Sequence, residues 1–195
     1  MRFSWLLGMA FLEVVDAHAG TCSKVAQPSV RVYVQNVVIV PAYDLSRAEM
    51  TAERIFEGIG IRIKFDHGNP PRGRPSGTCE SDASIEVRLD AHAPADRAPW
   101  VLGYATIHER TGVRVHVFYD RVRSIHGGDM STPVLGHVLA HEIAHVLQGE
   151  SHHSTEGLLK ARWDEQDYAA MAAHSLRFTP EDAGLLREGL RNATE

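Results

Sequence analysis

The chain has 195 residues, enough for one domain with a substantial buried core, and its composition is that of a globular protein. Its formal net charge is −5 and its Lys and Arg residues form no concentrated basic stripe, which excludes nucleic acid as the main partner. The apolar run near the N-terminus is too short to span a bilayer and no later segment qualifies, so we expect no membrane in the mature form.

Residues 1–19 are predicted to be an export signal. Arg2 provides a positive start, residues 3–12 are apolar, and Ala-His-Ala at residues 17–19 matches a small-x-small cleavage site. The alternative is an apolar N-terminal helix of the folded domain. We therefore expect a secreted or periplasmic monomer with a single domain over residues 20–195.

Cys22 and Cys79 are the two cysteines of the chain, and neither stands in a Cys-x-x-Cys pair of the kind found in zinc knuckles or thioredoxin-type sites. In an exported protein we expect them to form a disulfide, which would stabilise the fold by about 4 kcal/mol in the chain-entropy model. Without export they would remain free thiols.

The first half of the chain alternates between strands and a helix. Residues 30–40 are rich in β-branched side chains and predict a strand, residues 44–58 have the apolar spacing of a helix, and residues 59–65 alternate as a second strand. This order implies a parallel pair with a crossover helix. A loop rich in Gly and Pro at residues 66–81 precedes a third short strand at residues 83–89.

The second half adds an antiparallel pair and then helices. Residues 100–107 and 113–119 predict two strands joined by a turn. Helices are predicted over residues 133–148, where Gly149 acts as the stop, over residues 163–174, and after the Thr179 cap. The predicted class is α+β, with a mixed, mostly parallel sheet of about five strands, a crossover helix, a central helix and C-terminal helices.

The strongest signal is His141-Glu142-Ile143-Ala144-His145, which falls within the predicted central helix. Residues four apart on a helix lie about 40° apart around the axis and about 6 Å along it, so His141 and His145 can direct both imidazoles at one Zn²⁺. Glu142 lies about 100° round from His141 and can reach a water on that ion as a general base. Two hydrogen-bonded core histidines are the alternative, but they leave the following pair His152-His153 unexplained. His137 lies too far along the axis to share the ion, and we expect it to be a packing residue.

Residues 141–163 resemble the metzincin-like branch of the zincin metallopeptidases, in particular predicted secreted bacterial zinc proteases with a His-Glu-x-x-His helix. These continue with Gly, a short spacer, His-Ser, two residues, Gly, an apolar pair that often ends in Met, and Lys-Ala-x-Trp. The matching positions here are Gly149, His153-Ser154, Gly157, Leu158-Leu159 and Lys160-Ala161-Arg162-Trp163. The resemblance implies that His153 is the third zinc ligand, with His152 as the alternative. It also implies that residues 113–119 form the edge strand that binds an extended substrate.

The chain departs from the standard metzincin pattern at two points. The Gly and third His of that pattern would fall at Gln148 and Ser151, so the loop is longer here, and Leu159 stands where a Met is expected. A gluzincin-type site would instead take a carboxylate from the following helix, where the candidates are Asp164, Glu165 and Asp167.

We therefore predict a secreted zinc metalloendopeptidase that acts on a peptide or protein substrate. Zn²⁺ would be held by His141, His145 and His153, and Glu142 would activate the zinc-bound water. The alternatives are a zinc-binding exported protein without proteolytic activity and an amidohydrolase of non-peptide substrates. Glu142 favours an enzyme, because a purely structural zinc site gains nothing from a general base there.

Overall fold

The computed structural model describes residues 29–70, 84–108 and 112–192. Five strands form one sheet in the order β2-β1-β3-β5-β4. Their bounds are Ser29–Asn36 for β1, Arg62–His67 for β2, Ser84–Asp90 for β3, Gly103–His108 for β4 and Gly112–Phe118 for β5. β1, β2, β3 and β5 run parallel, whereas β4 is antiparallel to β5. The predicted α+β class with a mixed, mostly parallel sheet is confirmed.

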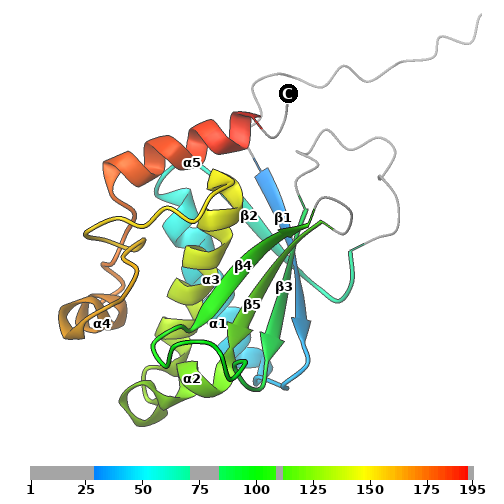
Figure 1. The fold of residues 1–195 in the computed structure, drawn as a ribbon, viewed down its shortest axis with the longest axis vertical. Coiled ribbons are helices and arrows are strands. Elements are labelled where there is room, and N and C mark those ends of the chain that lie inside the picture. Colours follow the sequence, from blue (N-terminus) through cyan, green and yellow to red (C-terminus); the bar gives the residue numbers. More distant parts are fainter. Residues whose placement is uncertain (1–28, 71–83, 109–111, 193–195) are drawn as a thin grey trace, which may run out of the picture.

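Helices α1 (Ala42–Glu57) and α3 (Ser131–Gln148) lie against one face of this sheet (Figure 1). Alternate residues of β1 and β3 are buried, because successive side chains of a strand point to opposite faces of the sheet. α3 is the centre of the molecule, with thirteen buried residues, because it packs against α1 and β4 and is crossed near its C-terminal end by α5 (Pro180–Asn192). Gly149 ends α3 at a positive φ of 74°, the conformation that glycine adopts at low cost.

Two helices complete the fold and border the candidate site. α2 (Tyr119–Ser124) follows β5 directly and continues into a short 3₁₀ turn, Ile125–Gly128. α4 (Glu165–Ala172) lies between α3 and α5 along the chain. No helix in the described part of the chain is long and apolar enough to cross a membrane.

Two sequence-based expectations need correction. The edge strand beside α3 is β4, formed by residues predicted at 100–107, and not the strand predicted at 113–119. The hairpin places β5 inside the sheet because β5 pairs in parallel with β3, which leaves β4 on the outside. The segment after β5 forms α2, which was not predicted. The predicted export signal, Cys22 and Cys79 lie outside the described residues and remain predictions.

Candidate metal centre

His141 and His145 lie one turn apart on α3, and their Nε2 atoms are 3.0 Å from each other. Nδ1 of His141 lies 2.9 Å from the carbonyl oxygen of Leu158, which can only accept, so this nitrogen donates and Nε2 keeps its lone pair. Burial lowers the pKa of His141 to about 3 and that of His145 to about 4, which makes both rings neutral at pH 7. Two neutral imidazole nitrogens therefore lie close together, and one cation could bind to both of them.

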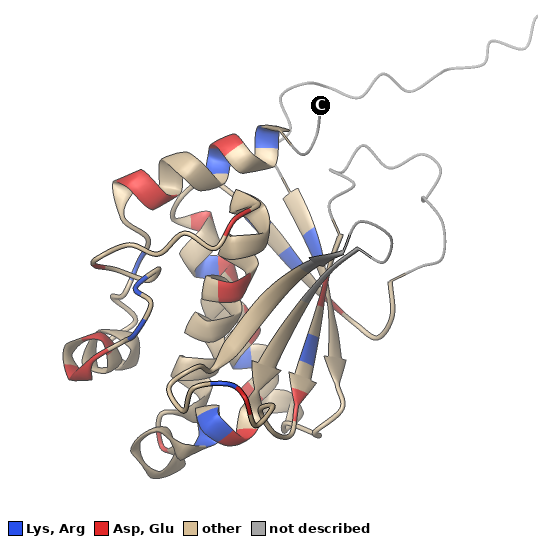
Figure 2. Cartoon of the chain, viewed as in Figure 1, with Lys and Arg blue, Asp and Glu red and all other residues tan. Residues whose placement is uncertain are grey.

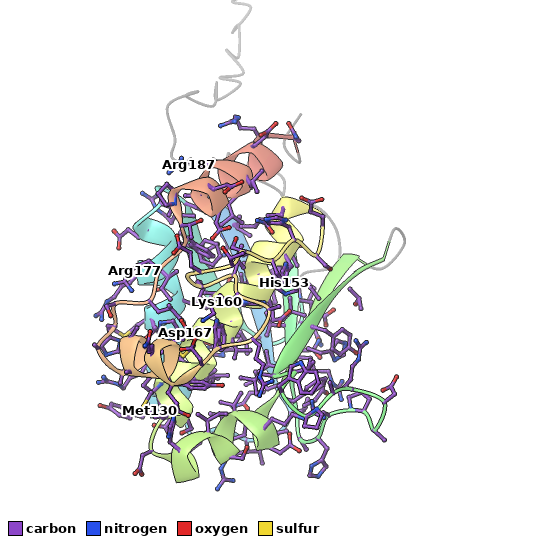
Figure 3. The ribbon with its side chains drawn as sticks, turned by 60° about the vertical axis from the view of Figure 1, so that its left-hand side comes forward. Met130, His153, Lys160, Asp167, Arg177 and Arg187 are labelled. Atoms are coloured by element: carbon purple, nitrogen blue, oxygen red, sulfur yellow. The ribbon has the colours of Figure 1, made fainter. Side chains whose placement is uncertain are left out.

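His153 joins the pair from the loop that follows α3 (Figure 3). Its ring centroid lies 5.5 Å from that of His141 and 4.7 Å from that of His145. The ligand atoms of the three histidines all lie within 4.8 Å of one another, and among the described residues no other group of His, Cys, Asp and Glu meets this condition. Three nitrogen ligands with one position open to the solvent are typical of catalytic zinc. The residues present therefore fit the metal that the sequence predicts, and His152 is not part of the cluster.

The loop of His153 is anchored at the N-terminus of α5. Ser154 Oγ donates to a carboxylate oxygen of Asp182, whose side chain is fully buried. The other oxygen of Asp182 accepts from the backbone N–H of Thr179 at 3.1 Å, and Thr179 Oγ1 accepts from the backbone N–H of Asp182 at 3.1 Å. Asp182 thus closes a capping box on α5 and holds the residue next to His153. The Thr179 cap was predicted, whereas the contact with Ser154 was not.

The carbonyl group of Leu158 orients His141 and a tryptophan at once. It accepts from His141 Nδ1 and from Trp163 Nε1, the latter at 3.1 Å. The Trp163 ring lies edge-on to His141 with a centroid separation of 5.4 Å. Hydrogen bonds of this kind fix the tautomer and the direction of a metal-ligating histidine. Leu159 is fully buried, and its carbonyl oxygen accepts from the backbone N–H of Ser154 at 2.9 Å.

Glu142 is buried between α3 and the edge strand β4. Gly103 at the start of β4 makes room for it, because a Cβ at this position would lie 3.0 Å from both Cγ and Oε1 of Glu142. Burial raises the pKa of the Glu142 carboxyl to about 8. A bound Zn²⁺ would favour the charged carboxylate, which is the form that accepts a proton. Gly103 was not singled out in the sequence, although a glycine inside a strand often marks such a close approach.

A cavity of about 900 Å³ opens over these residues. Its floor is α3, one wall is β4 with the loop at residues 97–102, and the other wall is the His153 loop with the start of α4. Residues of α2 and the 3₁₀ turn line it as well. The three histidines and Glu142 therefore border a space that is large enough for a segment of peptide.

The remaining predicted candidates lie away from the histidine cluster. Asp164 caps α4 and Lys160 Nζ contacts it at 2.7 Å, while the same amine also contacts Asp167. Glu165 faces His126, with 3.4 Å between its Oε2 and the ring Nε2. No carboxylate of α4 thus joins the three histidines, as a gluzincin-type site would require. His137 is fully buried in the core, as expected for a packing residue, and burial lowers its pKa to about 4.

Comparisons with known proteins point to the same fold. No family model and no curated protein sequence matches the chain. Among solved structures, archaemetzincin from Methanopyrus kandleri is similar over 87% of this chain and 98% of its own, with a TM-score of 0.51 and 14% sequence identity. Metalloproteinase-II from Bacteroides fragilis is matched over 84% of this chain and 53% of its own, with a TM-score of 0.49 and 11% identity. The likeness to archaemetzincin shows that the chain has a metzincin-like fold.

Proposed function

We propose that this chain is an exported zinc-dependent endopeptidase in which His141, His145 and His153 hold the ion and Glu142 is the general base. One observation carries the proposal: three histidine side chains offer ligand atoms within 4.8 Å of one another, beside a buried carboxylate and in a cavity of about 900 Å³. Structural zinc sites have four protein ligands, whereas catalytic sites have three and an open position. The fold shared with archaemetzincin supports this reading.

The chemistry divides between the ion and the protein. When bound, Zn²⁺ would supply a Lewis acid that polarises a carbonyl group and lowers the pKa of water toward about 7. A carboxylate oxygen of Glu142 takes the proton of the attacking water and then returns it to the leaving nitrogen. Leu158 keeps His141 in the tautomer whose Nε2 is free to bind a metal.

The substrate would lie in extended form along β4. This strand is one of the two edges of the described sheet, borders the cavity, and begins at Gly103 next to Glu142. A peptide that adds to such an edge gains main-chain hydrogen bonds regardless of its sequence. Its scissile bond would then be held beside the carboxylate that moves the proton.

Export and the disulfide belong to the same proposal. Purified protein from the periplasm or the medium would begin at Gly20, and its intact mass would show a bond between Cys22 and Cys79. N-terminal sequencing that finds Met1, or two reactive thiols, would contradict this part without affecting the metal centre.

The test of the proposed function compares zinc-loaded wild type with Glu142→Gln on an unfolded protein and on a peptide library. We expect both proteins to bind one zinc ion and the variant to lose about 10²–10⁴-fold in rate, the usual contribution of a general base. Glu156→Gln, which changes an exposed carboxylate in the His153 loop, is the matched control and should keep full activity. Equal hydrolysis by wild type and Glu142→Gln, or none by either, would reject the proposal.

A further inference from the structure

The cavity carries a different charge from the chain as a whole. The chain has a formal net charge of −5, yet four cationic side chains line the cavity, namely Arg97, Arg121, Lys160 and Arg162. Figure 2 shows basic positions on the loops of both walls. The carboxylates that line it are Glu142, Asp164 and Glu165. With a bound zinc ion added, the cavity would be positive.

Two of the four cations already have partners in the fold. The guanidinium group of Arg121 donates to the carbonyl groups of Ala98 at 2.6 Å and Val101 at 2.7 Å, and so holds the wall loop in place. Lys160 contacts the carboxylates of Asp164 and Asp167. These two side chains therefore shape the walls and are not available to a ligand.

Arg162 and Arg97 have no carboxylate partner among the described residues, and each lies over an aromatic ring. The Arg162 guanidinium lies 5.4 Å from the ring centroid of Trp100, and that of Arg97 lies 4.4 Å from the ring centroid of Tyr104. A cation–π contact engages no N–H donor in a hydrogen bond, and neither guanidinium group donates one to another described residue. Glu165, three residues after Arg162, pairs with His126.

The contact between Arg162 and Trp100 also joins the two walls of the cavity. Arg162 belongs to the loop that carries His153, whereas Trp100 belongs to the loop that leads into β4 and is 55% exposed. A peptide that occupies the cavity can therefore reach this pair. A planar guanidinium group with free edge donors binds carboxylates through two parallel hydrogen bonds.

We propose that Arg162, with Arg97, binds a carboxylate of the substrate, so that the preferred peptides carry an acidic group near the scissile bond. This inference rests on the proposed function and names its substrate class. The carboxylate can be the side chain of Asp or Glu or a free C-terminus, since both present the same group to a guanidinium.

The first experiment measures kcat and KM of zinc-loaded wild type, Arg162→Gln and Arg97→Gln on matched peptides. One set places Glu or Gln at each of the three positions on either side of the cleaved bond, and a second set compares a free C-terminus with its amide. Charge-assisted hydrogen bonds are worth about ten- to a hundredfold in binding, so we expect wild type to prefer the carboxylate by that factor, mainly through KM. Arg162→Gln should lose most of this preference and Arg97→Gln a smaller part. The responding set identifies the source of the carboxylate.

Arg47→Gln is the matched control, because Arg47 also lies over a ring, that of Tyr43 at 5.7 Å, but on α1 and outside the cavity. It should keep the wild-type preference. A second readout does not depend on hydrolysis: the dissociation constants of the same peptide pairs are measured on zinc-loaded Glu142→Gln with and without Arg162→Gln. If Glu142→Gln without the second substitution binds carboxylate and amide peptides with equal affinity, the inference is overturned even if no peptide is cleaved. Hydrolysis without any carboxylate preference overturns it while the proposed function stands.

Discussion

The edge strand β4 lies close to the candidate base at Gly103, and Gly103→Ala should damage catalysis without removing the metal. The new Cβ would lie 3.0 Å from Cγ and Oε1 of Glu142 and 2.8 Å from the carbonyl oxygen of His116 on β5. The His116 oxygen belongs to the backbone of a paired strand, which cannot move without disturbing the sheet. The substitution therefore displaces the Glu142 carboxylate by several tenths of an ångström or opens the β4–β5 pair.

These distances allow the losses in kcat and in stability to be estimated. Misplacing a reacting group by about 1 Å can cost a hundredfold in rate, so a smaller shift of Glu142 should lower kcat by about ten- to a hundredfold. Overpacking of this kind typically destabilises a protein by about 1–3 kcal/mol, which leaves it folded if its stability is ordinary. None of the three histidines provides any of the three atoms nearest to the new methyl group, so zinc stoichiometry should stay at the wild-type value.

The assay measures kcat on the best peptide substrate, zinc content, and urea unfolding of the same preparation. Gly184→Ala is the matched control, because a Cβ there meets no atom within 4 Å. A Gly103→Ala protein with wild-type kcat would refute the argument that Glu142 acts from its position against β4. Loss of zinc together with activity would refute the claim that the methyl group leaves the metal centre intact.

Three further substitutions test the supports of the site and the fold. Asp182→Ala removes the carboxylate that accepts a hydrogen bond from Ser154, the residue next to His153. Zinc affinity, measured by competition with a chelator, should therefore fall about 10–100-fold. Unchanged affinity would show that His153 does not need this anchor. Gly189→Ala would place a Cβ 2.0 Å from the carbonyl oxygen of Leu147. The free energy of unfolding, measured in urea, should therefore drop by about 1–3 kcal/mol. An unchanged free energy of unfolding would contradict the tight crossing of α3 and α5. Burial raises the pKa of Glu49 to about 6 from 4.5, so its contribution to stability is present below pH 4.5 and is lost as the pH rises through 6. Raising the pKa from 4.5 to about 6 corresponds to about 2 kcal/mol, so Glu49→Gln should gain about that much relative to wild type between pH 4 and pH 8, and equal pH profiles would refute this.

Most of the candidate site could be predicted because its parts are local in the sequence. The spacing of His141, Glu142 and His145 fixes their relative directions on any helix, and Gly149 and Thr179 mark helix ends by backbone chemistry alone. The strands were predicted for a similar reason, since alternation of buried side chains needs no knowledge of the neighbours.

The remaining features depend on contacts between distant segments. Both strands of the β4–β5 hairpin alternate, so the sequence does not reveal that β5 pairs with β3 and that β4 becomes the edge. Asp182 lies 28 residues beyond Ser154, and Arg121 lies 20 residues beyond the Val101 carbonyl that it holds. Among these features, only the close approach at Gly103 could have been suspected from the local sequence, because a glycine within a strand often marks such an approach.

The central claim is that His141, His145 and His153 together hold one zinc ion. Anomalous diffraction at the zinc edge, recorded from crystals of the zinc-loaded full chain, tests it most directly. We expect a single strong peak within bonding distance of Nε2 of His141, Nε2 of His145 and one ring nitrogen of His153. A peak elsewhere, a peak bound by His152 in place of His153, or a zinc-loaded protein without a peak in the cavity would contradict it.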